Sequence, residues 1–247
     1  MHYQSIPKPL VIVSLFIFVI VQSCTTKEVE PKDQLLKVIE KHGGLEIWKN
    51  TKTLAFQKGR EVHTTDLQTR RGVINHPKYS LGYDGKEVWL DQDSIFFKGN
   101  KVFYYNLYFY FYAMPFVLAD DGIILESASS ITYQDKQYQG IKVSYKANVG
   151  ESPDDNYILY FDGETHQMEW LAYTVTFNSQ KPSEKYSMIK YDQWVSSGGL
   201  LLPEQIIWYK TDESGNPTEP RRSPVVFTNP LVSGAQLADS FYQNPKK

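Results

Sequence analysis

The stretch Phe103-Tyr-Tyr-Asn-Leu-Tyr-Phe-Tyr-Phe-Tyr-Ala-Met-Pro-Phe116 stands out from the rest of the chain, because nine of its fourteen residues are aromatic. It is too long for one ordinary strand. We therefore expect a strand to end near Tyr105 and a helix to follow, capped by Asn106. Pro115 should kink or restart this helix. A helix that is apolar on all sides has to be surrounded by protein, ligand or lipid.

Two interpretations of this aromatic stretch remain open from the sequence. It is a core helix that plugs a curved sheet, or it also forms one wall or lid of an apolar pocket. A membrane span fits poorly, because several tyrosine hydroxyls, Asn106 and Pro115 would lie in hydrocarbon.

Short strands with turn dipeptides between them flank the aromatic stretch. Residues 79–83 and 86–90 surround Asp84-Gly85, and residues 94–98 and 101–105 surround Gly99-Asn100. Both dipeptides tolerate the positive φ of a tight hairpin turn. A later hairpin joins residues 157–161 to residues 167–177. The order of these segments predicts an antiparallel meander.

Several of the later strands are apolar on both faces. In residues 157–161 and 168–175 the apolar side chains do not alternate with polar ones. A sheet with one face in water should show that alternation. The second face is therefore covered, or it lines a cavity or a curved inner wall.

The domain is expected to span residues 33–247. Asp33 should cap an N-terminal helix that His42, Gly43 and Gly44 terminate. The polar tail from Ser233 to Lys247 should fray after Phe241.

Cys24, the only cysteine, directly follows the apolar run of residues 10–21. This run is too short to span a bilayer comfortably. Lys8, the run and Cys24 together have the layout of a secretory signal, and residues 21–24 resemble the lipobox of bacterial lipoproteins. We interpret residues 1–23 as the signal, Cys24 as the lipidated residue and residues 24–32 as a tether. An ordinary signal anchor with an incidental cysteine is the alternative. Thr25 is not the aspartate that favours inner-membrane retention, so the outer membrane is favoured.

Composition excludes several classes of function. Without residues 1–23 the chain has 25 basic and 28 acidic side chains, a formal charge of −3, which implies neither a nucleic acid nor an anionic membrane surface as partner. Lipidation of Cys24 leaves no thiol for a disulfide, metal site or nucleophile.

No catalytic, metal-binding or cofactor motif is present. Of the charged pairs, Arg70-Arg71 and Arg221-Arg222 could hold a phosphate or a lipid headgroup, but a solvated strand edge is the favoured explanation for both.

The order of these elements resembles the half-barrel of the LolA/LolB-like lipoprotein carriers. More closely, His42-Gly43-Gly44 with Trp48, residues 114–120, residues 152–157 and residues 168–171 look like a family of uncharacterised lipoproteins of Gram-negative bacteria. The resemblance implies a mainly β (α+β) fold, with a curved antiparallel sheet or half β-barrel, one N-terminal helix and an apolar helix in or over the concave face. It also implies an apolar cavity, which in the carriers holds acyl chains, and no catalysis.

These observations favour a lipid-anchored envelope protein that binds an acyl chain or another hydrophobic ligand between the sheet and the aromatic helix. A non-enzymatic interaction module with a self-filled core is the alternative, and a hydrolase is a distant third that would need His63 or His166 beside an acid and a serine. An apolar void of roughly 300 Å³ would favour the binding protein. The sequence indicates no particular protein partner. The expected ligand-lining residues are Trp89, Tyr105, Tyr108, Phe109, Tyr112, Phe116, Trp170 and Tyr173.

Overall fold

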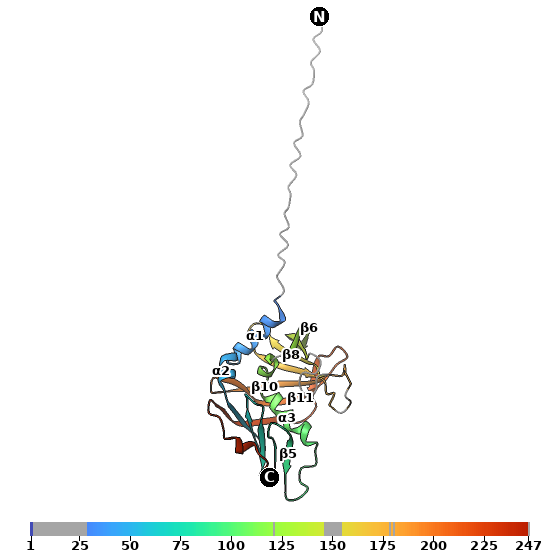
Figure 1. Ribbon diagram of the computed structural model, residues 1–247. Helices are drawn as coiled ribbons and strands as arrows, with labels where there is room; N and C mark the ends of the chain where they lie inside the picture. The colour runs from blue at the N-terminus through green and yellow to red at the C-terminus, as the bar shows by residue number, and fades with distance from the viewer. Residues whose placement is uncertain (2–28, 121, 146–154, 178, 180, 247) are drawn as a thin grey trace.

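The computed structural model describes residues 1, 29–120, 122–145, 155–177, 179 and 181–246 (Figure 1). The expected signal segment and lipidation residue Cys24 lie outside these residues. Within them, no helix combines the length and apolar character that a membrane crossing requires.

One antiparallel sheet organises the described part of the chain, with each strand mostly paired to its neighbour in sequence. The expected meander is therefore confirmed. The exceptions are the two pairings of β13, with β1 on one side, where Leu54 lies opposite Val232, and with β11 on the other, where Gln205 lies opposite Val226. From one edge to the other, the strands are β5 (Val88–Asp91), β4 (Tyr79–Tyr83), β3 (Gly72–His76), β2 (Glu61–Asp66), β1 (Thr53–Lys58), β13 (Val225–Ser233), β11 (Leu200–Thr211), β10 (Ser187–Ser197), β9 (Met168–Tyr173), β8 (Tyr157–Asp162), β7 (Lys136–Tyr145) and β6 (Ile123–Tyr133), while β12 (Pro217–Pro220) pairs with β11.

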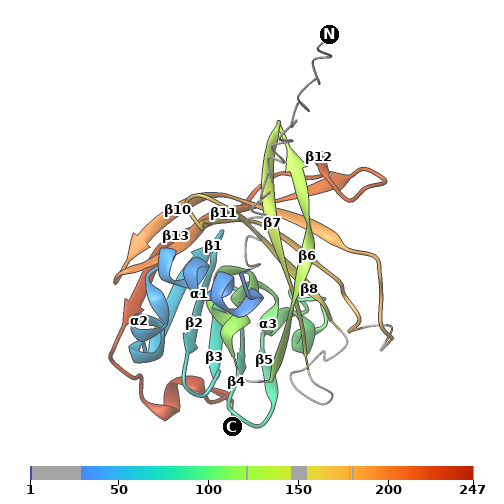
Figure 2. The ribbon, with the colours of Figure 1, turned by 90° about the horizontal axis from the view of Figure 1, so that it is seen from above.

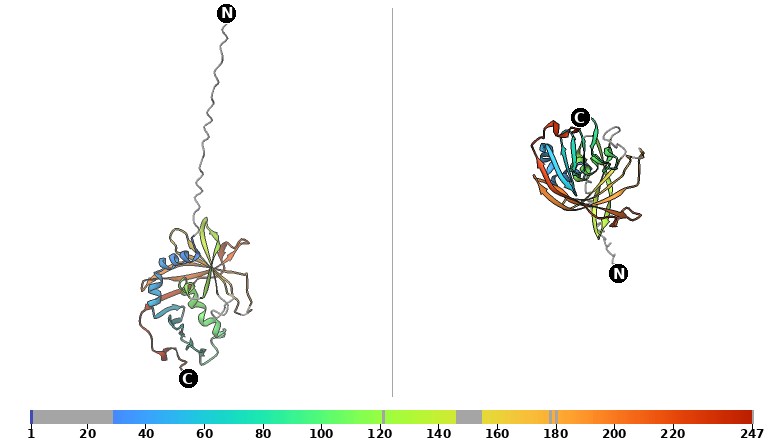
Figure 3. Two further views of the ribbon diagram at one scale, coloured as in Figure 1. Left: turned by 45° about the horizontal axis from the view of Figure 1, so that its top comes forward. Right: turned by 90° about the horizontal axis from the view of Figure 1, so that it is seen from below.

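The sheet curves around the aromatic helix without closing. Helix α3 (Lys101–Tyr112) and the short 3₁₀ helix η1 (Phe116–Ala119) connect β5 to β6, the strands at the two opposite edges. This connection crosses the concave side, and the strands form an arc around it in the views from above and from below (Figures 2 and 3). The expected curved antiparallel sheet with an apolar helix in its concavity is confirmed.

The start of the aromatic helix differs from the expectation. Helix α3 begins at Lys101, and the side chain of Asn100 accepts hydrogen bonds from the backbone N–H groups of Val102 and Phe103 at 3.0 and 3.2 Å. The expected hairpin at Gly99-Asn100 and the expected cap at Asn106 are therefore wrong. Both asparagines precede aromatic residues, but only Asn100 can satisfy the N–H groups of a helix that starts this early.

The N-terminal region contains two helices where one was expected. Helix α1 (Pro31–Lys41) starts at its proline, and Asp33, the expected cap, lies in the first turn. The helix ends before His42 and Gly43, as expected. Gly43 has φ +114°, and a Cβ there would lie 2.3 Å from the Gly199 carbonyl oxygen, so glycine is required. The second helix, α2 (Gly44–Asn50), follows at once.

Both faces of strands β8 to β11 are covered, as their sequences indicated. On the concave side lies an inner core, which includes Phe56, Phe111, Tyr112, Leu159 and Trp208. On the opposite side lies a smaller outer core, to which β6 and β7 also contribute side chains. The outer core consists of Ile131, Tyr138, Tyr160, Trp170, Ala172, Met188 and Tyr209.

The C-terminal segment packs against the sheet. Tyr242, in the 3₁₀ helix η2 (Asp239–Tyr242), is fully buried, and its carbonyl oxygen accepts a hydrogen bond of 2.9 Å from the indole N–H of Trp89. The sequence led us to expect fraying after Phe241, but the chain remains packed through Tyr242. All described helices and strands lie between Pro31 and Tyr242, and both cores are built from residues in this range. The segment from Val29 onward thus contains all of the described helices and strands.

Candidate binding site

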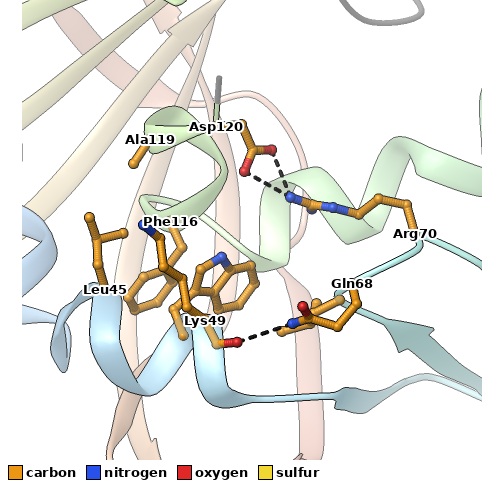
Figure 4. A pocket seen from close by; sticks show the side chains of 9 residues that line it. Leu45, Lys49, Gln68, Arg70, Phe116, Ala119 and Asp120 are labelled. Atoms are coloured by element: carbon orange, nitrogen blue, oxygen red, sulfur yellow. Dashed lines mark hydrogen bonds and ion pairs between the residues drawn. The ribbon is translucent and has the colours of Figure 1, made fainter. Parts of the chain in front are cut away.

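A cavity of about 320 Å³ lies between α2, the β2–β3 turn and η1 (Figure 4). The aromatic segment supplies one of its walls through η1, directly after α3. Its volume is at the lower end of the range of small-molecule sites. The lining residues are Leu45, Trp48, Lys49, Leu67, Gln68, Arg70, Phe116, Ala119 and Asp120.

The apolar wall of the cavity is rigid. The rings of Trp48 and Phe116 stack with centroids 4.8 Å apart and an angle of 10° between their planes. Phe116 is fully buried and Trp48 nearly so. Leu45 and Leu67 complete this wall. An apolar group that enters the cavity would therefore meet a surface whose side chains are already fixed by packing.

The opposite wall carries an ion pair. One guanidinium nitrogen of Arg70, Nη2, donates to both carboxylate oxygens of Asp120, at 2.9 and 2.7 Å (Figure 4). Arg70 has φ +60°, a conformation that costs free energy in a residue with a side chain. Its carbonyl oxygen accepts a hydrogen bond of 2.5 Å from the Tyr105 hydroxyl, and its guanidinium lies 5.3 Å from the ring centre of Phe109. Helix α3 thereby holds Arg70 in place beside the cavity.

The mouth of the cavity carries Lys49 and Gln68. The Gln68 side-chain amide donates to the backbone carbonyl of Lys49 at 3.1 Å, which ties the β2–β3 turn to the end of α2. The Lys49 side chain is exposed and extends toward Leu45 and Phe116 (Figure 4). Among the described residues its ammonium group forms no ion pair within 4.0 Å.

A polar network occupies the concave side beneath the first turns of α3. The Glu61 carboxylate accepts hydrogen bonds from the hydroxyls of Tyr79 and Tyr104, and it lies 2.7 Å from the ammonium nitrogen of Lys58. The ring nitrogen Nε2 of His63 lies 3.1 Å from the same carboxylate. Burial raises the pKa of Glu61, but the hydrogen bonds from these four partners outweigh it and hold the pKa well below its usual range.

His63 lies inside this network, beside the Glu61 carboxylate. Burial lowers its pKa, although the adjacent Glu61 carboxylate opposes that shift. The ring of His63 stacks on Phe56 with centroids 4.7 Å apart, and its Nε2–H donates to the Glu61 carboxylate. Lys58 then supplies the positive charge that balances the carboxylate. The network fastens α3 to β1, β2 and β4 and fills space that an acyl chain would otherwise need.

The residues of the suggested hydrolase do not assemble. His63 pairs with Glu61, while Asp66, three residues further on, accepts hydrogen bonds from the backbone N–H groups of Gln68 and Thr69 in the β2–β3 turn. His166 lies in the β8–β9 turn and stacks on Phe161. Neither histidine has a serine hydrogen-bonded to it among the described residues. In the same part of the chain, no three His, Cys, Asp or Glu residues are close enough to hold a metal ion.

The structure does not bring the eight expected lining residues together in one place. Phe116 lines the cavity, and Tyr105 and Phe109 contact its Arg70 from outside. Tyr112 stacks on Phe56 in the inner core, with ring centroids 4.0 Å apart. Tyr108 lies under Lys58, whose ammonium nitrogen is 4.2 Å from its ring centre.

The other three expected residues lie farther away. Tyr173 accepts a hydrogen bond of 2.8 Å from the indole N–H of Trp208, and its ring packs on Phe111 in the last turn of α3. Trp89 packs against Tyr242, and Trp170 belongs to the outer core on the opposite face of the sheet. Adjacent strand residues face opposite sides, so Leu171 points to the inner core and Trp170 does not.

Sequence reasoning missed most of the cavity wall. Trp48 was noted only as part of a resemblance, and Leu45 belongs to a helix that was not expected. Arg70 was considered as a headgroup ligand because of its neighbour Arg71, which instead lies 2.9 Å from Asp239. The arginine pair was the one feature of the sequence that pointed to this site, and only Arg70 of the pair lines the cavity.

Comparison with known proteins shows the family. Residues 41–193 match the model of DUF6503, a family of unknown function. The chain belongs to this family. That membership confirms the expected resemblance to an uncharacterised family. No curated protein matches the sequence of this DUF6503 member.

Solved structures with a similar fold share little sequence with this DUF6503 chain. A LolA superfamily protein from Nitrosomonas europaea is 8% identical with a TM-score of 0.46, over 89% of this chain and 100% of that chain. A DUF1329 family protein from Desulfovibrio piger is 8% identical with a TM-score of 0.47, over 88% and 99%. A putative outer membrane lipoprotein-sorting protein domain from Vibrio parahaemolyticus is 6% identical with a TM-score of 0.38, over 86% and 97%.

Proposed function

We propose that this protein binds a small amphiphilic ligand, such as a fatty acid, in the cavity between α2, the β2–β3 turn and η1. The observation that carries the proposal is the combination, in one cavity of about 320 Å³, of a fixed apolar wall at Trp48 and Phe116 with a charged wall at Arg70 and Asp120. Binding sites for small molecules place apolar surface beside a few fixed polar groups, and both are present in this cavity, where Lys49, Gln68, Arg70 and Asp120 supply the polar part.

The arrangement of charge suggests how the ligand is oriented. Its apolar part would lie against the stacked rings, and its polar end would lie at the mouth, near the ammonium group of Lys49. An acyl segment of eight carbons would contribute about 6 kcal/mol from burial before ordering costs, at about 0.8 kcal/mol per CH₂. Micromolar binding corresponds to about 8 kcal/mol, so the ligand's head group would also have to contribute to the binding free energy.

The space between α3 and the sheet is a less favourable ligand site. Phe109 and Phe111 are nearly buried and Tyr112 is fully buried, so α3 already fills much of the concavity. This packing is the observation that favours the alternative, an interaction module with a self-filled core. Our proposal places the ligand beside η1 instead, where the packing leaves space, and assigns no catalytic step to the protein.

We further propose that the domain acts in the cell envelope, anchored by a lipid on Cys24. The support is the layout of residues 1–24. An anchored binding domain would meet amphiphiles at the membrane surface, which agrees with the ligand class that the cavity favours.

Native mass spectrometry of the chain expressed from Val29 onward tests the binding function. We expect mass increments of an amphiphile after purification without detergent, or saturable uptake of a dansyl-labelled fatty acid by the apo protein. Apo protein alone together with no uptake of the labelled fatty acid would refute the proposal and leave the interaction module.

A further inference from the structure

The loop between β5 and α3, residues 92–100, exposes apolar side chains at one end of the molecule. Ile95 is 80% exposed and Phe96 43% exposed, and Val102, just after the loop, is 38% exposed. Single exposed apolar residues are normal on protein surfaces, but a group of them at one protruding site indicates an interaction. In Figure 1 this loop forms the bottom of the domain, opposite the start of α1.

Hydrogen bonds and ring contacts hold this loop in shape. The side-chain oxygen of Gln92 accepts hydrogen bonds from the backbone N–H groups of Phe96 and Phe97, at 3.2 and 2.9 Å. The ring of Phe97 packs on Tyr104, with centroids 5.2 Å apart, and Phe96 stacks on His76, with centroids 5.1 Å apart. The loop therefore displays Ile95 in a fixed position at little ordering cost on binding.

Positive charge surrounds the exposed apolar residues. The ammonium nitrogen of Lys78 lies 4.9 Å from the ring centre of Phe96. Lys98 and Lys101 are exposed on the loop and on the first turn of α3. These three lysines form no ion pair within 4.0 Å among the described residues.

The acidic residues at the base of the loop already have a partner. Lys246 lies 2.5 Å from an oxygen of Asp91 and 3.5 Å from an oxygen of Asp93. The tip of the loop is therefore locally positive, although the chain as a whole carries a small negative charge. Local charge, and not net charge, determines attraction at distances shorter than about 10 Å at 0.1 M salt.

We propose that this loop is a membrane-contact site, in which Ile95 and Phe96 enter the headgroup region of an anionic bilayer while Lys78, Lys98 and Lys101 face the lipid phosphates. Apolar side chains with a basic surround are the combination that binds such interfaces. The site is separate from the cavity at η1. It also lies at the end of the domain opposite to the start of α1 (Figure 1).

A single-cysteine label tests the proposal directly. The chain from Val29 onward contains no cysteine, because Cys24 is the only one in the sequence. Ile95→Cys therefore gives one site for the environment-sensitive dye NBD. Leu231→Cys, at a 53% exposed position on β13, gives the matched control. With vesicles of phosphatidylglycerol and phosphatidylethanolamine, we expect the emission to rise and shift to the blue at position 95 and to stay constant at position 231.

Two further variants separate the apolar and electrostatic contributions. Replacement of Ile95 and Phe96 together by serine, or of Lys98 and Lys101 together by glutamate, should each weaken vesicle cosedimentation of the unlabelled chain by about tenfold or more. Uptake of the labelled fatty acid should be the same in both variants as in the parent chain, so failure of this proposal is distinguishable from failure of the proposed function.

Three results would overturn the membrane-contact site. One is unchanged emission at position 95 with all vesicles. Another is an equal response at positions 95 and 231. The third is a concentration-dependent blue shift without vesicles, which would show that the loop binds a second copy of the chain and not a bilayer.

Discussion

The hydroxyl of Tyr104 donates to both oxygens of the Glu61 carboxylate, at 2.7 and 2.9 Å, and so joins α3 to β2. A buried carboxylate is costly unless donors surround it, and Glu61 has four such partners. This contact is one reason why α3 fills the concave side of the sheet as a fixed element. It also explains why a ligand is better placed beside η1 than beneath α3.

Glu61→Ala should lower the free energy of unfolding by about 3 kcal/mol or more, because Lys58, Tyr79 and Tyr104 would each lose a buried hydrogen-bond partner. Urea unfolding measures the change. Glu126→Ala is the matched control, because Glu126 pairs with Lys142 at 2.9 Å in an exposed position and should cost less than about 1 kcal/mol. Equal losses of unfolding free energy in the two variants would show that the buried Glu61 network stabilises the domain no more than an exposed ion pair does.

The domain should become less stable as the pH is lowered from 6.5 toward 4, because His42 is buried. The ring of His42 is fully buried, and its Nδ1 lies 3.2 Å from the Leu201 carbonyl oxygen. Burial lowers its pKa from 6.5 to about 4. Between these pH values the unfolded chain binds a proton that the folded chain does not. The free energy of unfolding therefore decreases as the pH falls from 6.5 toward 4, by at most about 1.4 kcal/mol per pH unit from this residue.

The variant His42→Asn isolates this effect, because the amide can still donate to Leu201 but does not titrate. Urea midpoints measured at several pH values should show a smaller slope between pH 6.5 and 4.5 in the variant than in the parent chain. The remaining slope would come from His63, whose pKa burial also lowers, and near pH 4.5 from Glu61, whose pKa its hydrogen bonds hold below the usual range. Identical slopes would rule out His42 as the source.

Tyr242→Ala should destabilise the domain by about 3 kcal/mol, since large buried aromatic side chains cost this much when truncated. The neighbouring Phe241 is 37% exposed, so Phe241→Ala is a matched control with a small expected effect. Thermal unfolding of both variants gives the comparison. If Tyr242→Ala melts like the parent chain, the C-terminal segment does not contribute to the fold.

Cys24→Ser should move the protein from the membrane fraction to the soluble fraction without unfolding it, because both cores are built from residues after Pro31. Cell fractionation combined with limited proteolysis checks this outcome. A variant that remains in the membrane fraction would contradict the lipid anchor, and an unfolded variant would contradict the independence of the domain.

The hairpin at Asp84-Gly85 could be predicted from the sequence because its information is local. Asp84 accepts hydrogen bonds from the backbone N–H groups of Lys86 and Glu87, at 2.8 and 2.9 Å, which is the turn chemistry that its position before Gly85 suggests. The start of α3 was harder to predict, because Asn100 and Asn106 are equivalent as caps until the helix is seen in place.

The candidate site could not be predicted from the sequence for a different reason. Its walls come from α2, the β2–β3 turn and η1, which are far apart in the sequence, and no local pattern links Leu45 to Arg70 or Ala119. The assignment of Trp170 to the ligand face failed because its strand is apolar on both sides. Only the packing of Ile131 and Tyr138 in one cluster with Trp170 shows which face is the outer core.

The most direct test of the proposed binding function is a titration of the chain from Val29 with a dansyl-labelled fatty acid, comparing Ala119→Trp with Ala128→Trp. Ala119 lines the cavity, whereas Ala128 lies on the edge strand β6 and is similarly half-buried. A tryptophan at position 119 should fill the cavity and weaken binding at least about tenfold, which corresponds to about 1.4 kcal/mol, while Ala128→Trp binds like the parent chain. Equal affinities in all three proteins would show that the cavity between α2, the β2–β3 turn and η1 is not the ligand site.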